Sequence, residues 1–108
     1  MSRKTTKPKK HPKLKTFKVQ QRITAGEATL FDGSIDNGVD IVEWLGPDNA
    51  RVAPDENNPG NVIHIFDHED GEEILYDIAF QDDYIIKTSD QTIECFNAEL
   101  FQDQWETQ

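Results

Sequence analysis

The chain has 108 residues, a formal net charge of −10 at pH 7 and a single cysteine. This length fits one domain with a modest core, and one cysteine excludes an internal disulfide and is typical of a protein made in a reducing cytoplasm. No apolar run reaches the roughly 18–20 residues of a membrane-spanning helix, so we expect no membrane contact, and the N-terminus lacks the apolar stretch of a signal peptide.

The charges are strongly separated along the chain. Residues 1–18 carry +8 without an acid, whereas residues 19–108 hold all 21 acids against three cations, a net charge of −18. We therefore predict a basic arm, residues 1–16, followed by a single acidic domain, residues 17–108. The cations with which this arm would bind a partner are Arg3, Lys4, Lys7, Lys9, Lys10, Lys13, Lys15 and Lys18.

The arm is polar and is interrupted by Pro8 and Pro12, so it cannot bury enough apolar surface to fold alone. We expect it to have no secondary structure of its own and to be ordered only by a partner. Three interpretations remain open: a solvated tail without a role, an arm that lies on an acidic partner surface, and a contact with nucleic acid through phosphates.

The first part of the acidic domain contains short strand-like runs separated by turns and by a loop over residues 48–60. Gly26 permits a bend or bulge between the first two runs. The runs are residues 17–23, 27–31, 51–53 and 61–66.

A helix is predicted over residues 36–45, because apolar residues recur there at helical spacing and Gly46-Pro47 follows. Asp36 or Asn37 can cap its N-terminus. Trp44 is expected in the core or at its edge.

The stretch from Glu73 to Trp105 predicts three strands and a closing helix. Apolar residues alternate over residues 74–80, which is typical of a strand with one buried face. Two further runs, residues 84–88 and 92–96, are separated by so few residues that we expect antiparallel neighbours in a β-meander. Asn97 can cap a helix that extends to Trp105.

These elements together predict an α+β fold. We expect an antiparallel sheet of four to six strands with two short helices, near residues 36–45 and 97–105. The residues expected to be largely buried are Ile65, Ile74, Tyr76, Ile78, Ile85, Ile93, Phe101 and Trp105.

The densest polar cluster surrounds a predicted hairpin turn over residues 67–72. Imidazoles and carboxylates can bind Zn²⁺ or Ca²⁺, but the spacing does not match a calcium loop, and we interpret the cluster as a charged hairpin tip without a metal. Its members are His64, Asp67, His68, Glu69, Asp70, Glu72 and Glu73.

No other pattern points to catalysis or to a cofactor. The chain has no glycine-rich phosphate loop, no Cys-x-x-Cys and no nucleophile elbow. We expect Asp83 to tie its turn through its side chain and Cys95 to be a buried reduced thiol. The sequence therefore predicts a protein that is not an enzyme, with no catalytic or metal-binding residues.

Four blocks follow one another in a specific order: residues 27–33 (EATLFDG), 41–46 (IVEWLG), 83–87 (DYIIK) and 97–101 (NAELF), the last followed by Trp105. In this order they resemble the small bacteriophage-encoded proteins of the PGDYG-like type, over about residues 17 to 105. Asp82 and Gln91 stand where that family has glycine, so we expect different turn geometry there. The resemblance implies a phage source and no reaction. Its structural motif corresponds to Trp44, Asp83, Tyr84, Asn97, Phe101 and Trp105.

Two classes of function follow from these observations. The first is a structural or accessory protein of a phage particle that docks on a larger assembly, with its arm on a neighbouring acidic surface. The second is an acidic inhibitor or sequestering module that acts on a host defence or nucleic-acid-binding protein, because a charge of −18 can imitate the phosphates of DNA. A small-ligand binder is a third class, for which the sequence has no pocket signature.

Overall fold

The computed structural model describes residues 14–20 and 25–107 and has an α+β fold of two antiparallel sheets and two helices. Several strands agree closely with the predicted runs. The elements in chain order are β1 (Phe17–Gln20), β2 (Ala25–Leu30), α1 (Ile35–Leu45), β3 (Ala50–Pro54), β4 (Asn61–Glu69), β5 (Glu72–Ala79), β6 (Tyr84–Thr88), β7 (Ile93–Phe96), α2 (Ala98–Gln104) and β8 (Glu106–Thr107).

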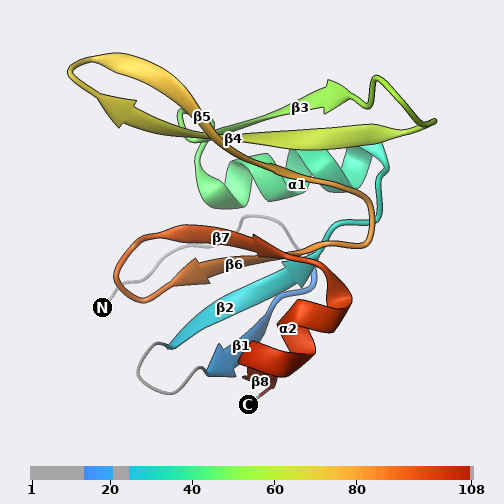
Figure 1. Cartoon of the computed structure of the whole chain (residues 1–108), viewed down its shortest axis with the longest axis vertical. Helices are drawn as coiled ribbons and strands as arrows, with labels where there is room; N and C mark the ends of the chain where they lie inside the picture. Colours follow the sequence, from blue (N-terminus) through green and yellow to red (C-terminus); the bar gives the residue numbers. More distant parts are fainter. Residues whose placement is uncertain (1–13, 21–24, 108) are drawn as a thin grey trace.

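The elements form layers (Figure 1). The five-stranded sheet has the order β7-β6-β2-β1-β8, and the three-stranded sheet has the order β3-β4-β5. Helix α1 lies between the two sheets and packs on β3 and β4, whereas α2 covers the opposite face of the five-stranded sheet. The five-stranded sheet is therefore covered on both faces, and the three-stranded sheet on one.

The first core fills the space between the sheets around α1. A glycine in the middle of this helix, Gly38, is buried, and a Cβ there would lie 3.0 Å from Val52 and 3.4 Å from the Phe31 ring. The missing side chain thus lets strand β3 and Phe31 approach the helix closely. The buried members of this core are Phe31, Ile41, Leu45, Ala50, Ile63, Ile65, Ala79 and Ile85.

The second core lies between the five-stranded sheet and α2. Tyr84 and Phe101 stack with ring centroids 4.1 Å apart, and Phe17 meets both rings edge-on. Offset and edge-on ring pairs add to the stabilisation that burial alone provides. The buried members are Val19, Ala28, Ile86, Phe101 and Trp105.

The predicted β-meander over residues 73–96 is wrong in its first connection. β5 pairs with β4 in the three-stranded sheet, whereas β6 pairs with β2 and β7 in the other sheet. Residues 80–83, which connect β5 to β6, lead the chain from one sheet to the other and are held by the Phe31 backbone. Phe31 N donates to Asp83 O at 3.0 Å, and Asp82 N donates to Phe31 O at 2.7 Å. A short connection permits pairing but does not require it. The pairing of β6 with β7 is confirmed.

The burial predicted along β5 is also partly wrong. Ile74 and Tyr76 are 44% and 59% exposed, Phe80 is exposed and Ile78 is half-buried. The hairpin end of β5 projects beyond the five-stranded sheet, and the register shifts at Tyr76, so the alternation does not continue along one face. Among the other residues predicted to be buried, Ile93 is half-buried, and burial is confirmed for Ile65, Ile85, Phe101 and Trp105.

The predicted N-cap residue is confirmed for α2 but is wrong for α1. Asn97 caps α2, because its side chain accepts from Leu100 N at 2.9 Å. Helix α1 is capped by Ser34, which accepts from Asn37 N at 3.1 Å, and not by Asp36 or Asn37. The Asn37 side chain instead accepts from Asp32 N and closes the turn before the helix.

Asp82 and Gln91, the two turn positions for which a different geometry was expected, both adopt left-handed backbone angles, with φ of 73° and 74°. This is the conformation that favours glycine. Such angles cost an ordinary residue roughly 1–2 kcal/mol, and aspartate tolerates them better than glutamine.

Gln91→Gly is therefore expected to raise the free energy of unfolding by about 0.5–1 kcal/mol, the left-handed cost less the added chain entropy of glycine. Urea unfolding followed by circular dichroism measures the change. Ser89→Gly, in the same turn but without a positive φ, is the matched control and is expected to be destabilising. Equal losses in the two variants would contradict the strain at Gln91.

Candidate interaction surface

The hairpin formed by β4 and β5 exposes an apolar strip, residues 74–76, whose side chains are divided between the two faces of β5. Ile74, Leu75 and Tyr76 are consecutive and are 44%, 48% and 59% exposed. Asp70 and Gly71 both have positive φ, as a two-residue hairpin turn requires, so the hairpin is a regular one that extends into solvent. A strip of this kind on a charged domain is typical of a surface that contacts another protein.

The outer edge of β5 is open for pairing. Within the described part of the chain, β5 pairs only with β4 and stands last in its sheet. An edge strand presents unpaired N–H and C=O groups, which can bond an added strand. The exposed apolar side chains and the free backbone groups therefore occur on the same segment.

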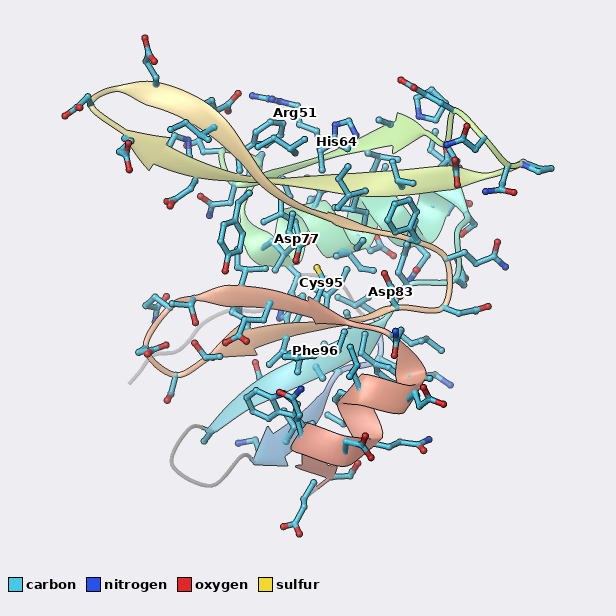
Figure 2. All side chains as sticks on the ribbon, viewed as in Figure 1. Arg51, His64, Asp77, Asp83, Cys95 and Phe96 are labelled. Carbon is cyan, nitrogen blue, oxygen red and sulfur yellow. The ribbon has the colours of Figure 1, made fainter. Side chains whose placement is uncertain are left out.

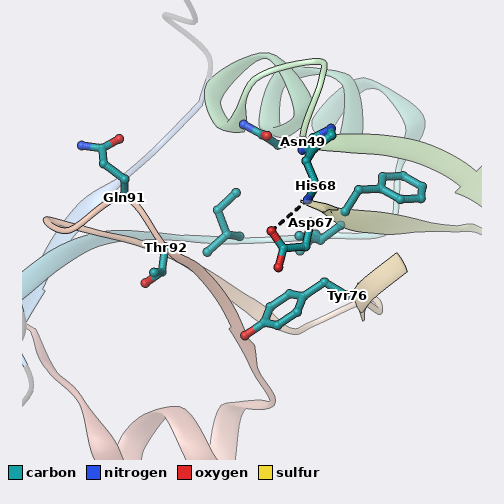
Figure 3. Close-up of a pocket in the computed structure, with 9 residues that line it drawn as sticks. Asn49, Asp67, His68, Tyr76, Gln91 and Thr92 are labelled. Carbon is teal, nitrogen blue, oxygen red and sulfur yellow. Dashed lines mark hydrogen bonds between the residues drawn. The ribbon is translucent and has the colours of Figure 1, made fainter. Parts of the chain in front are cut away.

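A cleft of about 250 Å³ opens between the sheets beside this hairpin (Figure 3). Asp67 and Tyr76 reach it from the hairpin, and Gln91 and Thr92 reach it from the turn between β6 and β7. Apolar side chains at its base belong to the first core or pack against it. Its lining residues are Asn49, Ile65, Phe66, Asp67, His68, Tyr76, Gln91, Thr92 and Ile93.

Polar groups in the cleft have unused bonding capacity. Asp67 Oδ1 accepts from His68 N at 2.9 Å, and no described residue bonds the other carboxylate oxygen. The Tyr76 hydroxyl and the Gln91 side-chain amide also have no hydrogen-bond partner among the described residues. The cleft thus combines an apolar base with a carboxylate, a phenol and an amide that a ligand can reach.

The charge around the cleft is negative. The hairpin carries exposed carboxylates at Asp67, Glu69, Asp70 and Glu72. Arg51 Nη2 pairs with Glu73 Oε2 at 2.5 Å, which offsets one acid of this group. The next cation along the chain, Lys87, donates to Trp44 O at 3.1 Å and lies 4.8 Å from the centre of the Trp44 ring. Among residues 14–20 and 25–107, no ion pair therefore offsets the carboxylates of Asp67, Glu69, Asp70 and Glu72.

The outer face of the three-stranded sheet has a different character (Figure 2). The Arg51 guanidinium lies 4.7 Å from the centre of the Phe66 ring, and His64 meets the same ring edge-on. Glu73 holds Arg51 in place, and Leu75 is paired with Phe66 across the strands. This face is therefore a mixed aromatic and basic strip on the side of β5 opposite the cleft.

The structure separates the predicted polar cluster. His64 lies on the outer face with Phe66, and the His68 ring lies towards Glu73, whereas the Asp67 carboxylate reaches the cleft. His68 Nε2 is 3.9 Å from Glu73 Oε2. No group of three His, Cys, Asp or Glu side chains in the described ranges has the geometry to hold a metal ion.

Cys95 lies between the sheets beside two carboxylates (Figure 2). Burial raises the pKa of its thiol strongly, and the carboxylates of Asp77 and Asp83 raise this pKa further. The thiol is therefore protonated at neutral pH and is a poor nucleophile. Cys95 is unpaired and half-buried, so the predicted burial of this thiol is only partly borne out.

Asp83 ties its turn, as predicted. Phe80 N donates to Asp83 Oδ2 at 2.9 Å, and Asp83 N donates to Phe80 O at 3.0 Å. Burial raises the pKa of the Asp83 carboxyl, the bond from Phe80 N opposes this change, and Asp77 and Asp82 raise the pKa further. Because the folded pKa is raised, this group contributes stability at low pH that is lost as pH rises through the folded value.

Asp83→Asn is expected to raise the free energy of unfolding at pH 7 by less than about 1 kcal/mol, since the carboxylate is partly solvated. The amide oxygen can still accept from Phe80 N, while the ionisation penalty disappears. Urea unfolding at pH 7 and near pH 3 checks this, and the variant's gain should vanish at the lower pH. Asp103→Asn on α2 controls for the general loss of one negative charge. A clear loss of stability at pH 7 would show that the charge itself holds the turn.

The six residues of the predicted structural motif are placed in supporting roles and not in one site. Trp44 packs at the edge of the first core beneath Lys87. Tyr84, Phe101 and Trp105 build the second core, and Asn97 and Asp83 hold a cap and a turn. They explain the fold and contribute no side chain to the cleft.

Only two of the eight cations predicted to bind a partner lie among the described residues. Lys15 and Lys18 are exposed, and the remaining cations of the arm lie outside the described residues. Leu14 packs against the first core, and Lys15 O accepts from Thr29 Oγ1 at 2.9 Å. Residues 14–16 have no helix or strand, as predicted. However, Leu14 and Lys15 contact the acidic domain, so the expectation that only a partner orders the arm is wrong for these residues.

The cleft itself was not predicted from the sequence. Asn49, Gln91 and Thr92 come from separate turns, and nothing local marks them as neighbours of Asp67. The apolar strip did leave a signal: three consecutive apolar residues, 74–76, cannot all point to one face of a strand.

No family model, no curated protein and no solved structure matches this chain. Neither described helix is long and apolar enough to cross a membrane.

Proposed function

We propose that this chain is a non-enzymatic docking protein of a bacteriophage, an accessory or structural component that attaches to a larger protein assembly. The observation that carries the proposal is the exposed strip Ile74–Tyr76 on an open strand edge. Large apolar side chains on such an edge are a liability in a free protein, and a docked partner removes that liability.

Two groups suited to chemistry support the same proposal. The Cys95 thiol is held protonated between two carboxylates, and the Asp83 carboxylate closes a turn. The phage source rests on the family resemblance of the sequence. Left-handed angles at Asp82 and Gln91, where that family has glycine, support this resemblance.

The basic arm completes the proposed attachment. Its cations can pair with an acidic surface of the partner, and several such pairs together offset the entropy lost when an extended segment is ordered. Because Leu14 and Lys15 contact the body, a truncation that tests the arm without disturbing these contacts removes residues 1–13.

The test compares full-length protein with a variant that lacks residues 1–13. Virions of the phage that encodes the chain would be purified and examined by mass spectrometry, beside an affinity pull-down from infected lysate. We expect the protein in the particle, with the truncated form retained less well, and the difference should shrink at high salt. The thermal melting temperature of the truncated protein should be nearly unchanged.

Two results would contradict the proposal. Equal occupancy of both forms at low and high salt would remove the arm from the mechanism. A protein absent from virions and recovered on a host defence or nucleic-acid-binding protein would replace docking with the inhibitor hypothesis.

A further inference from the structure

We propose that β5 receives an extended segment of the partner as an added strand, and that the neighbouring cleft binds one lysine or arginine side chain of that segment. This inference rests on the proposed docking function and specifies the chemistry of the partner. The occupant is an extended segment that alternates apolar residues with a central basic residue.

The strand edge provides the backbone contacts. In a two-residue hairpin the residues that flank the turn form a hydrogen-bonded pair, and bonded and non-bonded pairs then alternate along the ladder. Counting from Glu72, the N–H and C=O groups of Glu73 and Leu75 point away from β4. Phe66, opposite Leu75, agrees with this count, because its N–H points away from β5 and donates to Asn49 O at 2.8 Å.

The two faces of β5 determine the pattern of the segment. Ile74 is paired with Asp67, which lines the cleft, and Leu75 is paired with Phe66, beneath Arg51. Successive side chains of an added strand point to alternate faces, so a residue opposite Ile74 faces the cleft and its two neighbours lie beside Glu73 and Leu75 on the outer face. Apolar neighbours suit that outer face.

The cleft suits a long basic side chain. Ile65 and Ile93 can contact the methylene groups of lysine or arginine, while Asp67 has a free carboxylate oxygen for the charged head. The Tyr76 ring adds a face on which a cation can lie, and the Gln91 amide oxygen can accept from it. An acidic side chain would meet Asp67 and the carboxylates of the hairpin tip and be repelled.

The same charges disfavour a second copy of this chain on the strand edge. Two bodies of net charge −18 would bring their hairpin carboxylates together across the new pair of strands. A basic segment of another protein has the complementary charge.

The probe is a capped nine-residue peptide in which threonine and valine alternate and lysine occupies the central position on the threonine face. Titration of the full-length, ¹⁵N-labelled protein should shift the amide resonances of residues 73–77 and of Gln91 and Thr92. A peptide with glutamate in place of lysine should bind at least about tenfold more weakly, because the repulsion replaces an attraction.

Two matched pairs of variants locate the contacts. Asp67→Asn should weaken binding of the lysine peptide about threefold to tenfold, whereas Asp103→Asn, which removes an equal charge from the distant α2, should change it little. Leu75→Pro removes an outward N–H and should weaken binding more than Leu75→Ala, which loses the side chain alone. If Leu75→Pro does not fold, the Asp67 pair and the two peptides still decide the question.

Several outcomes would overturn the inference. Equal affinity for the lysine and glutamate peptides would show that the cleft does not select a basic side chain. Resonance shifts confined to the outer face of the three-stranded sheet would show that the peptide does not add as a strand beside the cleft. Self-association of the full chain in sedimentation that Leu75→Pro abolishes would assign the edge to a second copy. Stronger peptide binding after removal of residues 1–13 would assign the cleft to the protein's own arm. Each of these results leaves virion attachment, and hence the proposed function, to its own test.

Discussion

Trp105→Ala is expected to lower the free energy of unfolding by about 3–5 kcal/mol, the range measured when a large aromatic residue is deleted from a core. The Trp105 side chain is 4% exposed and meets the Phe96 ring edge-on with centroids 6.3 Å apart. It closes the second core at the end of α2. Urea unfolding followed by circular dichroism measures the loss.

Trp105→Phe is the control, because it keeps an aromatic ring in the core. Trp105 Nε1 is buried and has no hydrogen-bond partner among the described residues, so phenylalanine removes an unsatisfied donor while it retains much of the volume. We expect this variant to lose less than about 1.5 kcal/mol. A Trp105→Ala protein that unfolds at the same urea concentration as the wild type would show that α2 is peripheral to stability.

Phe31→Ala is expected to cost a similar 3–5 kcal/mol in the first core. The Phe31 ring is fully buried against Gly38, and its backbone is fixed by bonds to Asp82 and Asp83, so the chain cannot easily collapse into the cavity. Phe31→Leu retains part of the volume and should cost markedly less. Small and equal losses in the two variants would mean that the backbone bonds of Phe31, which both variants retain, hold the sheets together without the ring.

The two tryptophans allow these variants to report on different cores. Trp44 packs against the first core and Trp105 belongs to the second, so Trp105→Phe leaves one fluorescent reporter for the space between the sheets. Because both cores share the five-stranded sheet, we expect fluorescence and circular dichroism to give coincident unfolding transitions. Separate transitions would show that the layers unfold independently.

Local patterns in the sequence were sufficient to predict much of the fold. Strand β6 matches its predicted bounds, and the Asn97 cap and the helix end at Gly46 follow from side-chain and backbone chemistry within a few residues. Burial of Ile74 and Tyr76 could not be predicted in this way, because it depends on whether another layer extends beneath them. Alternation shows that a strand has two faces, but not which face is covered.

The candidate site was harder to predict for the same reason. Asp67 and Tyr76 lie on one sheet, and Gln91 and Thr92 lie in a turn of the other. Their proximity results from the corner at residues 80–83, which the sequence presented as an ordinary turn between neighbouring strands. Asp82 there adopts a left-handed angle that glycine prefers, which its residue type does not indicate.

The strand order also determines when each sheet can form during synthesis. Residues 35–79 supply α1 and the whole three-stranded sheet from one continuous segment, whose contacts are mostly between neighbours in sequence. The five-stranded sheet instead joins β1 and β2 to β6, β7 and β8, and Val19 pairs with Thr107 at the far end of the chain. Contacts so distant in sequence form slowly, and they require that β6, β7 and β8 have been synthesised. On the ribosome, the inserted segment can therefore fold first, while β1 and β2 wait for these later strands to emerge.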